Sequence, residues 1–133
     1  MFVPLEDLNE AVRCACDERP EDGIYQATII QARIGYSKAG NRQIIWDLEF
    51  MNRQTKKPYQ CQKYHSLESP WIDYVVRDLK KFRITLDHIQ ELPQVLMELT
   101  GSTVRIEYNQ DGDWYNLRFI SLICKRSDPE CCL

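Results

Sequence analysis

The amino-acid sequence predicts a mainly β protein with one helical insert, and three observations lead to this fold class. Within residues 43–51 every second position from 44 to 50 is a large apolar residue, which is the period of a half-buried strand. Residues 24–33 just before them are rich in β-branched residues and carry no charge until Arg33, as strands often do. Helical spacing of apolar residues follows later, within residues 69–100, so a helix separates two groups of strands.

Residues 1–23 form an acidic lead-in, with seven acidic and two basic side chains. Within this segment Leu5, Leu8 and Val12 lie at helical spacing. The Pro and Gly residues at positions 20 and 23 then end the pattern. We expect a short helix that packs on the sheet as an appendage.

The first two strands are predicted at residues 24–34 and 43–51, joined by a flexible turn. Gly40 and Asn41 in this turn tolerate left-handed backbone conformations at little cost. On the second strand the apolar face is expected to point into the core and to include Trp46. The core is also expected to hold Tyr25 and Tyr108.

A polar turn at residues 52–58 leads to a third strand at 59–67, whose inward face the sequence does not reveal. A helix follows, for which Ser69 is a plausible N-cap and Pro70 a suitable first-turn residue. Its apolar stripe consists of Ile72, Val75, Val76, Leu79 and Phe82. Trp71, at the start of this helix, is expected to be a packing anchor.

A second helical stretch is predicted at residues 87–100, interrupted by Pro93 and ended by Gly101. The fourth strand is expected at 103–108, with Val104, Ile106 and Tyr108 on one face. Residues 109–112, Asn-Gln-Asp-Gly, predict a hairpin turn into a fifth strand at 114–123.

Three strands, a helix and two strands form the layout of an OB-fold, a five-stranded Greek-key barrel. The sequence therefore predicts an acidic lead-in at 1–23, an OB-fold domain at 24–123 and a flexible Cys-containing tail at 124–133. In such a barrel the ligand face belongs to the second and third strands. The flanking arms here are residues 35–42 and 109–113.

Composition and charge limit the possible functions. The 133 residues suit one domain, and no apolar run reaches the roughly 18 residues of a membrane span. The net charge of -3 does not favour nucleic acid, but residues 31–66 hold seven basic and two acidic side chains. We expect a cytoplasmic protein without cofactor or metal. Its six cysteines are expected to be free thiols: Cys14, Cys16, Cys61, Cys124, Cys131 and Cys132.

The order and spacing of several short motifs resemble a family of phage and prophage OB-fold proteins. This family was long described only as a domain of unknown function, and its members are regarded as single-stranded-DNA-binding proteins. The likeness covers about residues 20–123. Its motifs are Gly23-x-Tyr25-x-Ala27-x-Ile29, the turn at 37–41, the strand at 44–50, Lys63-Tyr-His-Ser-Leu67, Leu92-Pro-x-x-Leu96 and Trp114-Tyr-Asn-Leu117.

The resemblance implies non-catalytic binding of single-stranded DNA during phage replication or recombination, in a bacterial host cell. Proteins of phage replication or recombination are then expected as further partners. The oligomeric state stays open, and a homodimer is among the alternatives. Binders of this kind combine a cationic groove with aromatic rings on which bases stack. The candidate cations are Arg33, Lys38, Arg42, Arg53, Lys56, Lys57 and Lys63, and the candidate rings are Tyr36, Tyr59, Tyr64 and Trp114.

Two alternatives remain open at this point. An OB-fold that binds another protein would agree better with the negative net charge. A metal-dependent nuclease is suggested by Asp47 and Glu49, which share one strand face. However, nuclease sites of this kind usually place an acidic residue two positions before a lysine, and Cys61 stands there before Lys63.

Overall fold

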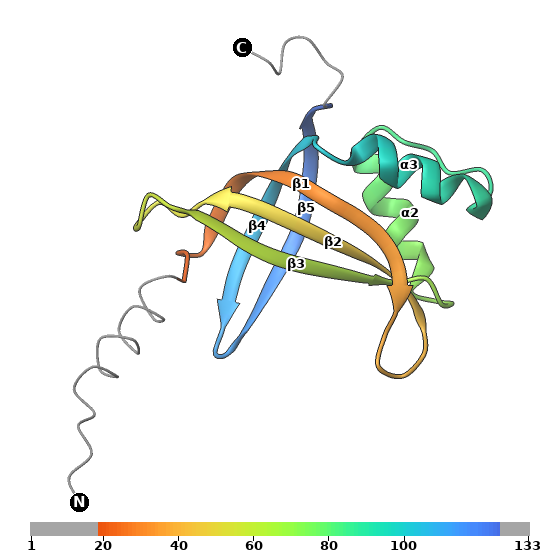
Figure 1. The fold of residues 1–133 in the computed structure, drawn as a ribbon, viewed down its shortest axis with the longest axis horizontal. Coiled ribbons are helices and arrows are strands. Elements are labelled where there is room, and N and C mark those ends of the chain that lie inside the picture. Colours follow the sequence, from red (N-terminus) through yellow and green to blue (C-terminus); the bar gives the residue numbers. More distant parts are fainter. Residues whose placement is uncertain (1–18, 126–133) are drawn as a thin grey trace, which may run out of the picture.

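The computed structural model describes residues 19–125, which form a five-stranded antiparallel sheet with a helical insert between the third and fourth strands (Figure 1). The strands lie in the order β3-β2-β1-β4-β5. The predicted class and the position of the insert are therefore confirmed, whereas the predicted lead-in helix lies outside the described residues. The elements are β1 Gly23–Tyr36, β2 Arg42–Met51, β3 Pro58–Ser66, α2 Ile72–Lys81, the 3-10 helix η1 Ile89–Glu91, α3 Leu92–Leu99, β4 Thr103–Asp111 and β5 Trp114–Cys124.

Strand β1 holds the sheet together because it has two partners. Its first half pairs with β4, and its second half pairs with β2. A β-bulge lies at Ile30, since Ile29 pairs with Leu48 while Gln31 already pairs with Asp47. One extra residue reverses the faces of a strand. Odd-numbered side chains therefore face the core before the bulge, and Ala32 does so after it, while Ile34 and Tyr36 further along are exposed.

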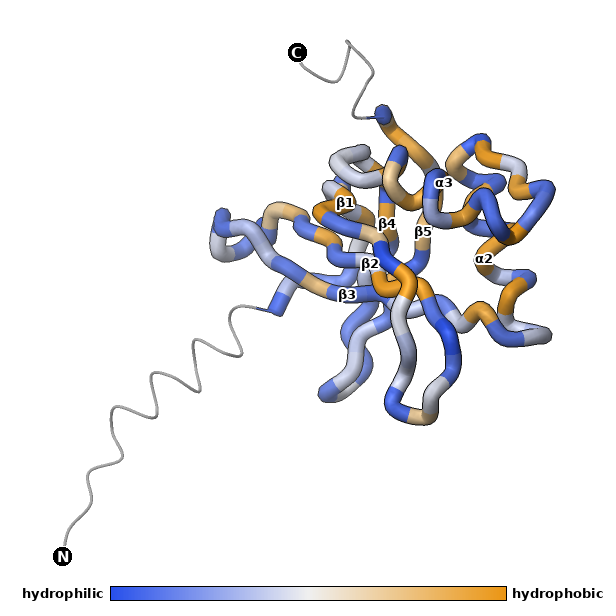
Figure 2. Tube along the Cα trace, turned by 45° about the vertical axis from the view of Figure 1, so that its right-hand side comes forward, coloured by the Kyte–Doolittle hydropathy of each residue, from blue (hydrophilic) through white to orange (hydrophobic). Residues whose placement is uncertain are grey.

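The core lies between one face of the sheet and the helical insert. Trp46 is 1% exposed, and its ring meets the rings of Phe82 and Phe119 edge-on. As predicted, Tyr25 and Tyr108 are buried as well. The helices contribute their apolar stripes. Figure 2 shows mainly hydrophilic turns and strands that mix hydrophobic and hydrophilic residues, with β3 the more hydrophilic.

The helical insert begins differently from the prediction. Ser69 does not cap α2, because Trp71 is the N-cap residue and no side chain bonds to the helix start. The first amides are instead satisfied by carbonyl groups of the preceding turn, including those of Glu68 and Pro70. Pro93 does not interrupt a helix but lies in the first turn of α3, where a missing N–H costs nothing. Gly101 follows the helix with φ of +87°, as a C-terminal glycine should.

The β4–β5 hairpin turns later than predicted. The ladder continues to the pair Asp111 and Trp114, so that only Gly112 and Asp113 form the turn. Gly112 has φ of +59°, the left-handed conformation that two-residue hairpin turns require. The tighter turn places Trp114 directly at the tip of the hairpin.

The closed barrel is not confirmed. Strands β3 and β5 are the two edges of the sheet, and no backbone ladder joins them among the described residues. We call the gap between these two edges the seam. The Tyr115 hydroxyl bridges it, because it accepts a hydrogen bond from the Gln62 N–H at 3.1 Å and donates one to the Gln62 carbonyl at 3.0 Å.

The cysteines are only partly as expected. Cys61 is a free, buried thiol on β3, but Cys124 at the end of β5 is disulfide-bonded. The expectation of six free thiols is therefore wrong at Cys124. None of the helices within residues 19–125 is long and apolar enough to cross a membrane.

Candidate nucleic-acid interface

The register between β2 and β3 decides which side chains of β3 face the core. Lys63 pairs with Trp46, and Cys61 pairs with Leu48, so both lie on the inner face. His65, two residues further, is buried on the same face. Tyr64 therefore points outward, which the alternation of the sequence alone could not settle.

Lys63 is a seam residue rather than an exposed cation. Its ammonium group donates a hydrogen bond to the Leu117 carbonyl on β5 and lies 5.6 Å from the centre of the Phe119 ring. Burial lowers the pKa of Lys63 because it disfavours the charged form, an effect that Asp78 nearby opposes. The predicted phosphate ligand thus also links the two edges of the sheet.

A groove follows the seam, and we call it the seam groove. Two of its aromatic rings are exposed: Trp114 is 79% and Tyr64 54% exposed. The rings come from opposite edges of the sheet, β5 and β3, with Lys63 between them. The groove is lined by Gln62, Lys63, Tyr64, Asp113, Trp114, Tyr115, Asn116 and Leu117.

The predicted arm residues on the β1–β2 hairpin differ in whether they are ion-paired. Tyr36 is 74% exposed and Lys38 is exposed, with no ion pair of Lys38 among the described side chains. Arg42 forms a two-pronged pair with Glu68, at 3.0 and 3.2 Å. Hydrogen bonds from Arg42 also hold the pKa of Glu68 below its ordinary value. Phosphate would have to displace Glu68 in order to reach Arg42.

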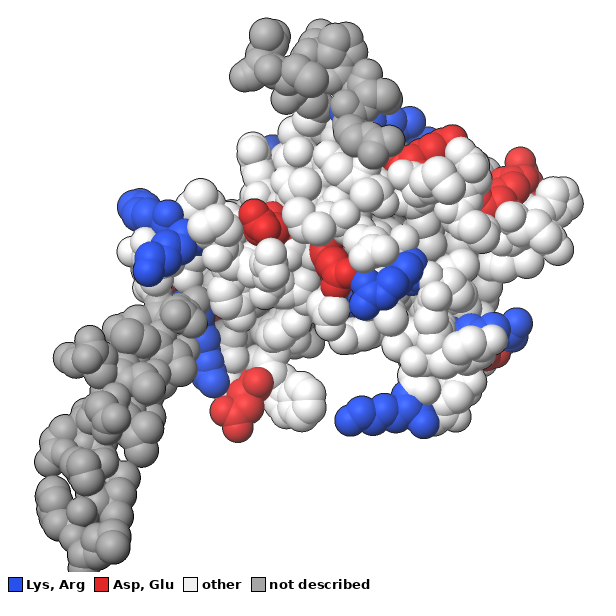
Figure 3. Space-filling view, viewed as in Figure 1, with Lys and Arg blue, Asp and Glu red and all other residues white. Residues whose placement is uncertain are grey.

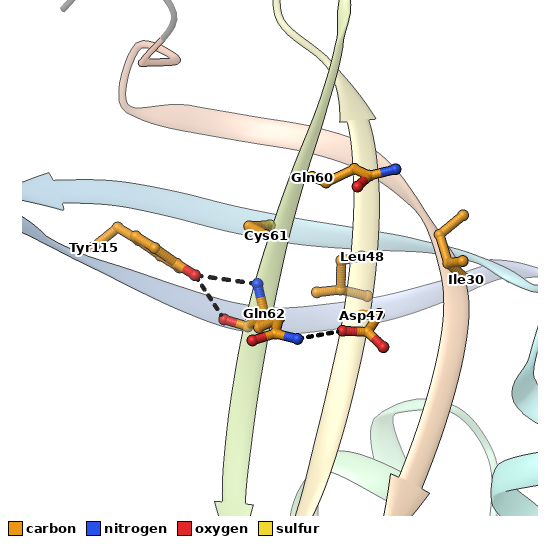
Figure 4. Close-up of a pocket in the computed structure, with 7 residues that line it drawn as sticks. All are labelled: Ile30, Asp47, Leu48, Gln60, Cys61, Gln62 and Tyr115. Atoms are coloured by element: carbon orange, nitrogen blue, oxygen red, sulfur yellow. Dashed lines mark hydrogen bonds between the residues drawn. The ribbon is translucent and has the colours of Figure 1, made fainter. Parts of the chain in front are cut away.

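The outer face of β1–β3 is a polar network rather than a cationic surface. Arg33 pairs with Asp47, whose other oxygen accepts a hydrogen bond from the Gln62 amide at 2.7 Å. Glu49 accepts one from Gln60. Figure 4 shows a pocket lined by part of this network, in which Gln62 is bonded to Asp47 on one side and to Tyr115 on the other. Both carboxylates proposed for a nuclease are therefore partnered, and Arg33 is ion-paired with one of them.

The β2–β3 turn lies at the other end of the sheet. Arg53 packs on the Tyr25 ring at 4.1 Å and donates to the Ile24 carbonyl, so it has a structural role. Lys56 and Lys57 are exposed. About 30 Å of β2, at about 3.3 Å per residue, separates them from the hairpin arm. Tyr59 is half-buried against the core, with its ring 5.5 Å from that of Phe50.

The structure adds residues on α2 that the sequence analysis missed. Trp71 is not a packing anchor, since it is 56% exposed and stacks beside the equally exposed Tyr74. Arg77 lies over the other ring of this pair, at 5.6 Å. Their spacing of three residues on a helix was a readable signal, because residues three apart lie on one face. On β5, Arg118 was also missed, and it pairs with Glu107 at 3.3 Å.

The positive charges form separate groups. Figure 3 shows one group at the end of the molecule that Figure 1 assigns to the β2–β3 turn, and others on the side of α2 and the β1–β2 hairpin. Below the sheet, the space between the hairpin arm and the β4–β5 turn is open in this view. The charges of α2 line the neighbouring hollow, whereas the only Lys or Arg among the described residues that lines the seam groove itself is Lys63.

A buried hydrogen-bond chain positions α2 next to this groove. The Trp46 indole N–H donates to His65 Nδ1 at 2.9 Å, so the His65 proton lies on Nε2, 2.8 Å from Asp78 Oδ2 on α2. Lys81 reaches the other Asp78 oxygen at 3.1 Å. This chain connects the core, β3 and α2.

Within residues 19–125, no group of three or more His, Cys, Asp or Glu side chains is arranged to hold a metal ion. The chain matches no family model and no curated protein. The likeness to phage single-stranded-DNA-binding proteins therefore stays a prediction.

Proposed function

We propose that this protein binds single-stranded DNA, with little sequence preference, in the seam groove. The role is non-catalytic and belongs to phage replication or recombination inside a bacterial host cell. The observation that carries the proposal is the pair of exposed rings, Trp114 and Tyr64, on either side of Lys63. Large exposed aromatic side chains contribute little to folding, and their placement along one groove suits a ligand with flat faces.

The chemistry of the groove matches an unpaired DNA strand. Each base offers a flat face that stacks on an aromatic ring, for about 1–3 kcal/mol per base. Lys63 places a positive charge beside the groove, and Lys38 on the hairpin arm is an exposed cation for the phosphates of a bound strand. Affinity that comes from stacking and phosphate contacts is largely independent of sequence.

The sheet itself supports an OB-like architecture. Its strand order is that of an OB-fold barrel opened between β3 and β5. The β4–β5 turn borders the groove, and the β1–β2 hairpin borders a separate hollow near the end of β3. We propose that this protein is an OB-fold in which side chains, rather than a backbone ladder, bridge the final pair of strands.

Titration of labelled oligo-dT at two salt concentrations tests this function. We expect saturable binding that weakens with salt, because bound phosphates release counterions. Trp114→Ala should lower the affinity about tenfold, since one stacking contact is lost. Its melting temperature should not change, because the side chain is exposed. Met97→Ala, an exposed apolar residue on α3, is the matched control and should bind like the parent.

Lys38→Ala tests the phosphate contact of the hairpin arm. The slope of log affinity against log salt should fall by about 0.7. Lys38 is the best choice for this test, because Arg42→Ala would also release Glu68 and Lys63→Ala would disturb the seam. An unchanged slope would remove the hairpin arm from the interface.

Binding of a protein partner is the second candidate. Ile89 and Met97 are exposed on the helical insert, near the exposed acidic residues Glu91 and Glu98. Such a surface suits a basic protein better than DNA. Absence of oligonucleotide binding even at low salt would favour this candidate.

A further inference from the structure

The helix α2 presents a flat aromatic surface that its own packing does not need. Val75 and Leu79 bury the inner side of the helix. Trp71 and Tyr74 remain 56% and 53% exposed, with their rings within 20° of parallel and their centres 6.2 Å apart. Arg77 lies over the Tyr74 ring. We call these three residues the α2 shelf.

The α2 shelf borders a hollow that continues the seam groove. Lys63 and Tyr64 line both hollows, so the two adjoin along β3. Beyond Trp71 a third hollow leads to the β1–β2 hairpin at Ser37 and Asn41. A strand can therefore follow one surface from the β4–β5 turn, past β3 and α2, to the hairpin arm.

The charge of this hollow suits a phosphate backbone. Four basic side chains line it, whereas its one carboxylate, Asp78, is already bonded to His65 and Lys81. The ammonium groups of two of the four are bonded to β5 carbonyls. The guanidinium groups of Arg77 and Arg118 are at the surface, and that of Arg118 also pairs with Glu107. The basic residues are Lys63, Arg77, Lys81 and Arg118.

We propose that the α2 shelf is a second base-stacking site, which extends the single-stranded DNA path from the seam groove onto the helix. This inference rests on the proposed function. The contacts then depend on the length of the oligonucleotide. Short oligonucleotides occupy Trp114 and Tyr64 alone, and longer ones also reach Trp71 and Tyr74.

The first test compares oligo-dT of about 4 to about 16 nucleotides, the range of site sizes of single OB-folds. Trp71→Ala combined with Tyr74→Ala should leave the affinity for the shortest bound oligonucleotides unchanged. It should lower the affinity for the longest ones about tenfold or more, and the occluded site should become shorter. Melting temperatures should match, because both side chains are exposed.

Arg77 is tested against a matched cation of the same helix. Arg77→Ala should lower the salt slope for long oligonucleotides by about 0.7. Lys80→Ala should leave it unchanged, because Lys80 is exposed but lines none of these hollows.

Tryptophan emission reports the two sites separately. The chain has three tryptophans, and Trp46 is buried. In Trp114→Phe, which keeps a ring, the emission of Trp71 should be quenched only by the longer oligonucleotides. In Trp71→Phe, the emission of Trp114 should be quenched by short ones as well.

The outcomes separate the two proposals. A parent protein that binds no oligonucleotide would overturn both. Binding in which the double variant equals the parent at every length, or is weakened equally at every length, would overturn the extension alone. The extension alone would also be overturned if the emission of Trp71 never changed, or if it changed already with the shortest oligonucleotides.

Discussion

Trp46 contributes both apolar packing and a buried hydrogen bond to the core. Its ring packs against Phe82 and Phe119, and its indole N–H is satisfied by His65. A buried indole usually needs such a partner, because an unpaired N–H away from water is costly. At the residue scale the fold therefore depends on a few large side chains with specific neighbours.

Trp46→Ala should destabilise the protein by about 3–5 kcal/mol, through lost burial and the cavity left behind. Urea denaturation measures this loss. Trp114→Ala, which removes the same side chain from an exposed site, should stay within about 0.5 kcal/mol of the parent. Equal losses in the two variants would contradict the assigned burial.

Cys61 should react slowly with iodoacetamide in the native protein at pH 8. Burial raises the pKa of this thiol to about 12, so the reactive thiolate is scarce and shielded. Peptide mapping by mass spectrometry follows the modification of Cys61 over time. Addition of urea should bring it to the rate of an ordinary thiol, and a fast native reaction would mean that β3 opens readily.

At the scale of elements, polar contacts as well as apolar ones fix α2 on the sheet. His65 on β3 and Lys81 both bond to Asp78, which is largely buried. Burial by itself raises the pKa of Asp78, but these hydrogen bonds outweigh it and hold the pKa below its ordinary value of 3.8. The fold thus favours the ionised carboxylate.

Asp78→Asn should therefore be less stable than the parent at neutral pH, and the difference should shrink in acid. A folded pKa below the unfolded value stabilises the protein fully above the unfolded value, and this stabilisation is lost as pH falls through the folded value. Denaturation by urea at pH 7 and near pH 3 compares the two proteins. Asp73→Asn, at an exposed position of α2, should show no such trend.

At the scale of the whole molecule, the seam is the unusual feature. Two side chains form hydrogen bonds between the edge strands β3 and β5, where a backbone ladder is absent: Lys63 and Tyr115. Lys81 on α2 adds a hydrogen bond to the Phe119 carbonyl on β5. The same edges form the proposed DNA groove. An open edge attracts other strands unless it is covered or charged, and here lysine and tyrosine side chains cover it.

Tyr115→Phe should weaken the seam without altering the core. Loss of the hydroxyl leaves the Gln62 N–H and carbonyl without their partner, at a cost of about 1 kcal/mol. Hydrogen exchange should become faster at the Gln62 amide. Tyr74→Phe removes an exposed hydroxyl on α2 and should leave this exchange unchanged. Equal rates in the parent and in Tyr115→Phe would mean that the Tyr115 hydroxyl does not hold the seam.

Much of the fold was predictable from local patterns. The alternation along residues 43–51 placed Trp46 in the core, and Gly101 marked the end of α3. The hairpin turn near Gly112 was expected two residues too early, because Asn109 and Gly112 both favour turns and only the β4–β5 ladder decides between them. The site was predicted less well, since ion pairs such as Arg42 with Glu68 join residues far apart in sequence.

The sequence by itself determined the number of strands, the place of the helical insert and most of the buried side chains, because period and turn chemistry are local properties. Only the tertiary structure decided which face of β3 points inward, that Lys63 lies at the seam and that Trp71 is exposed. These features depend on the register between strands and on the packing of α2. Both come from contacts between distant segments, which no local pattern contains.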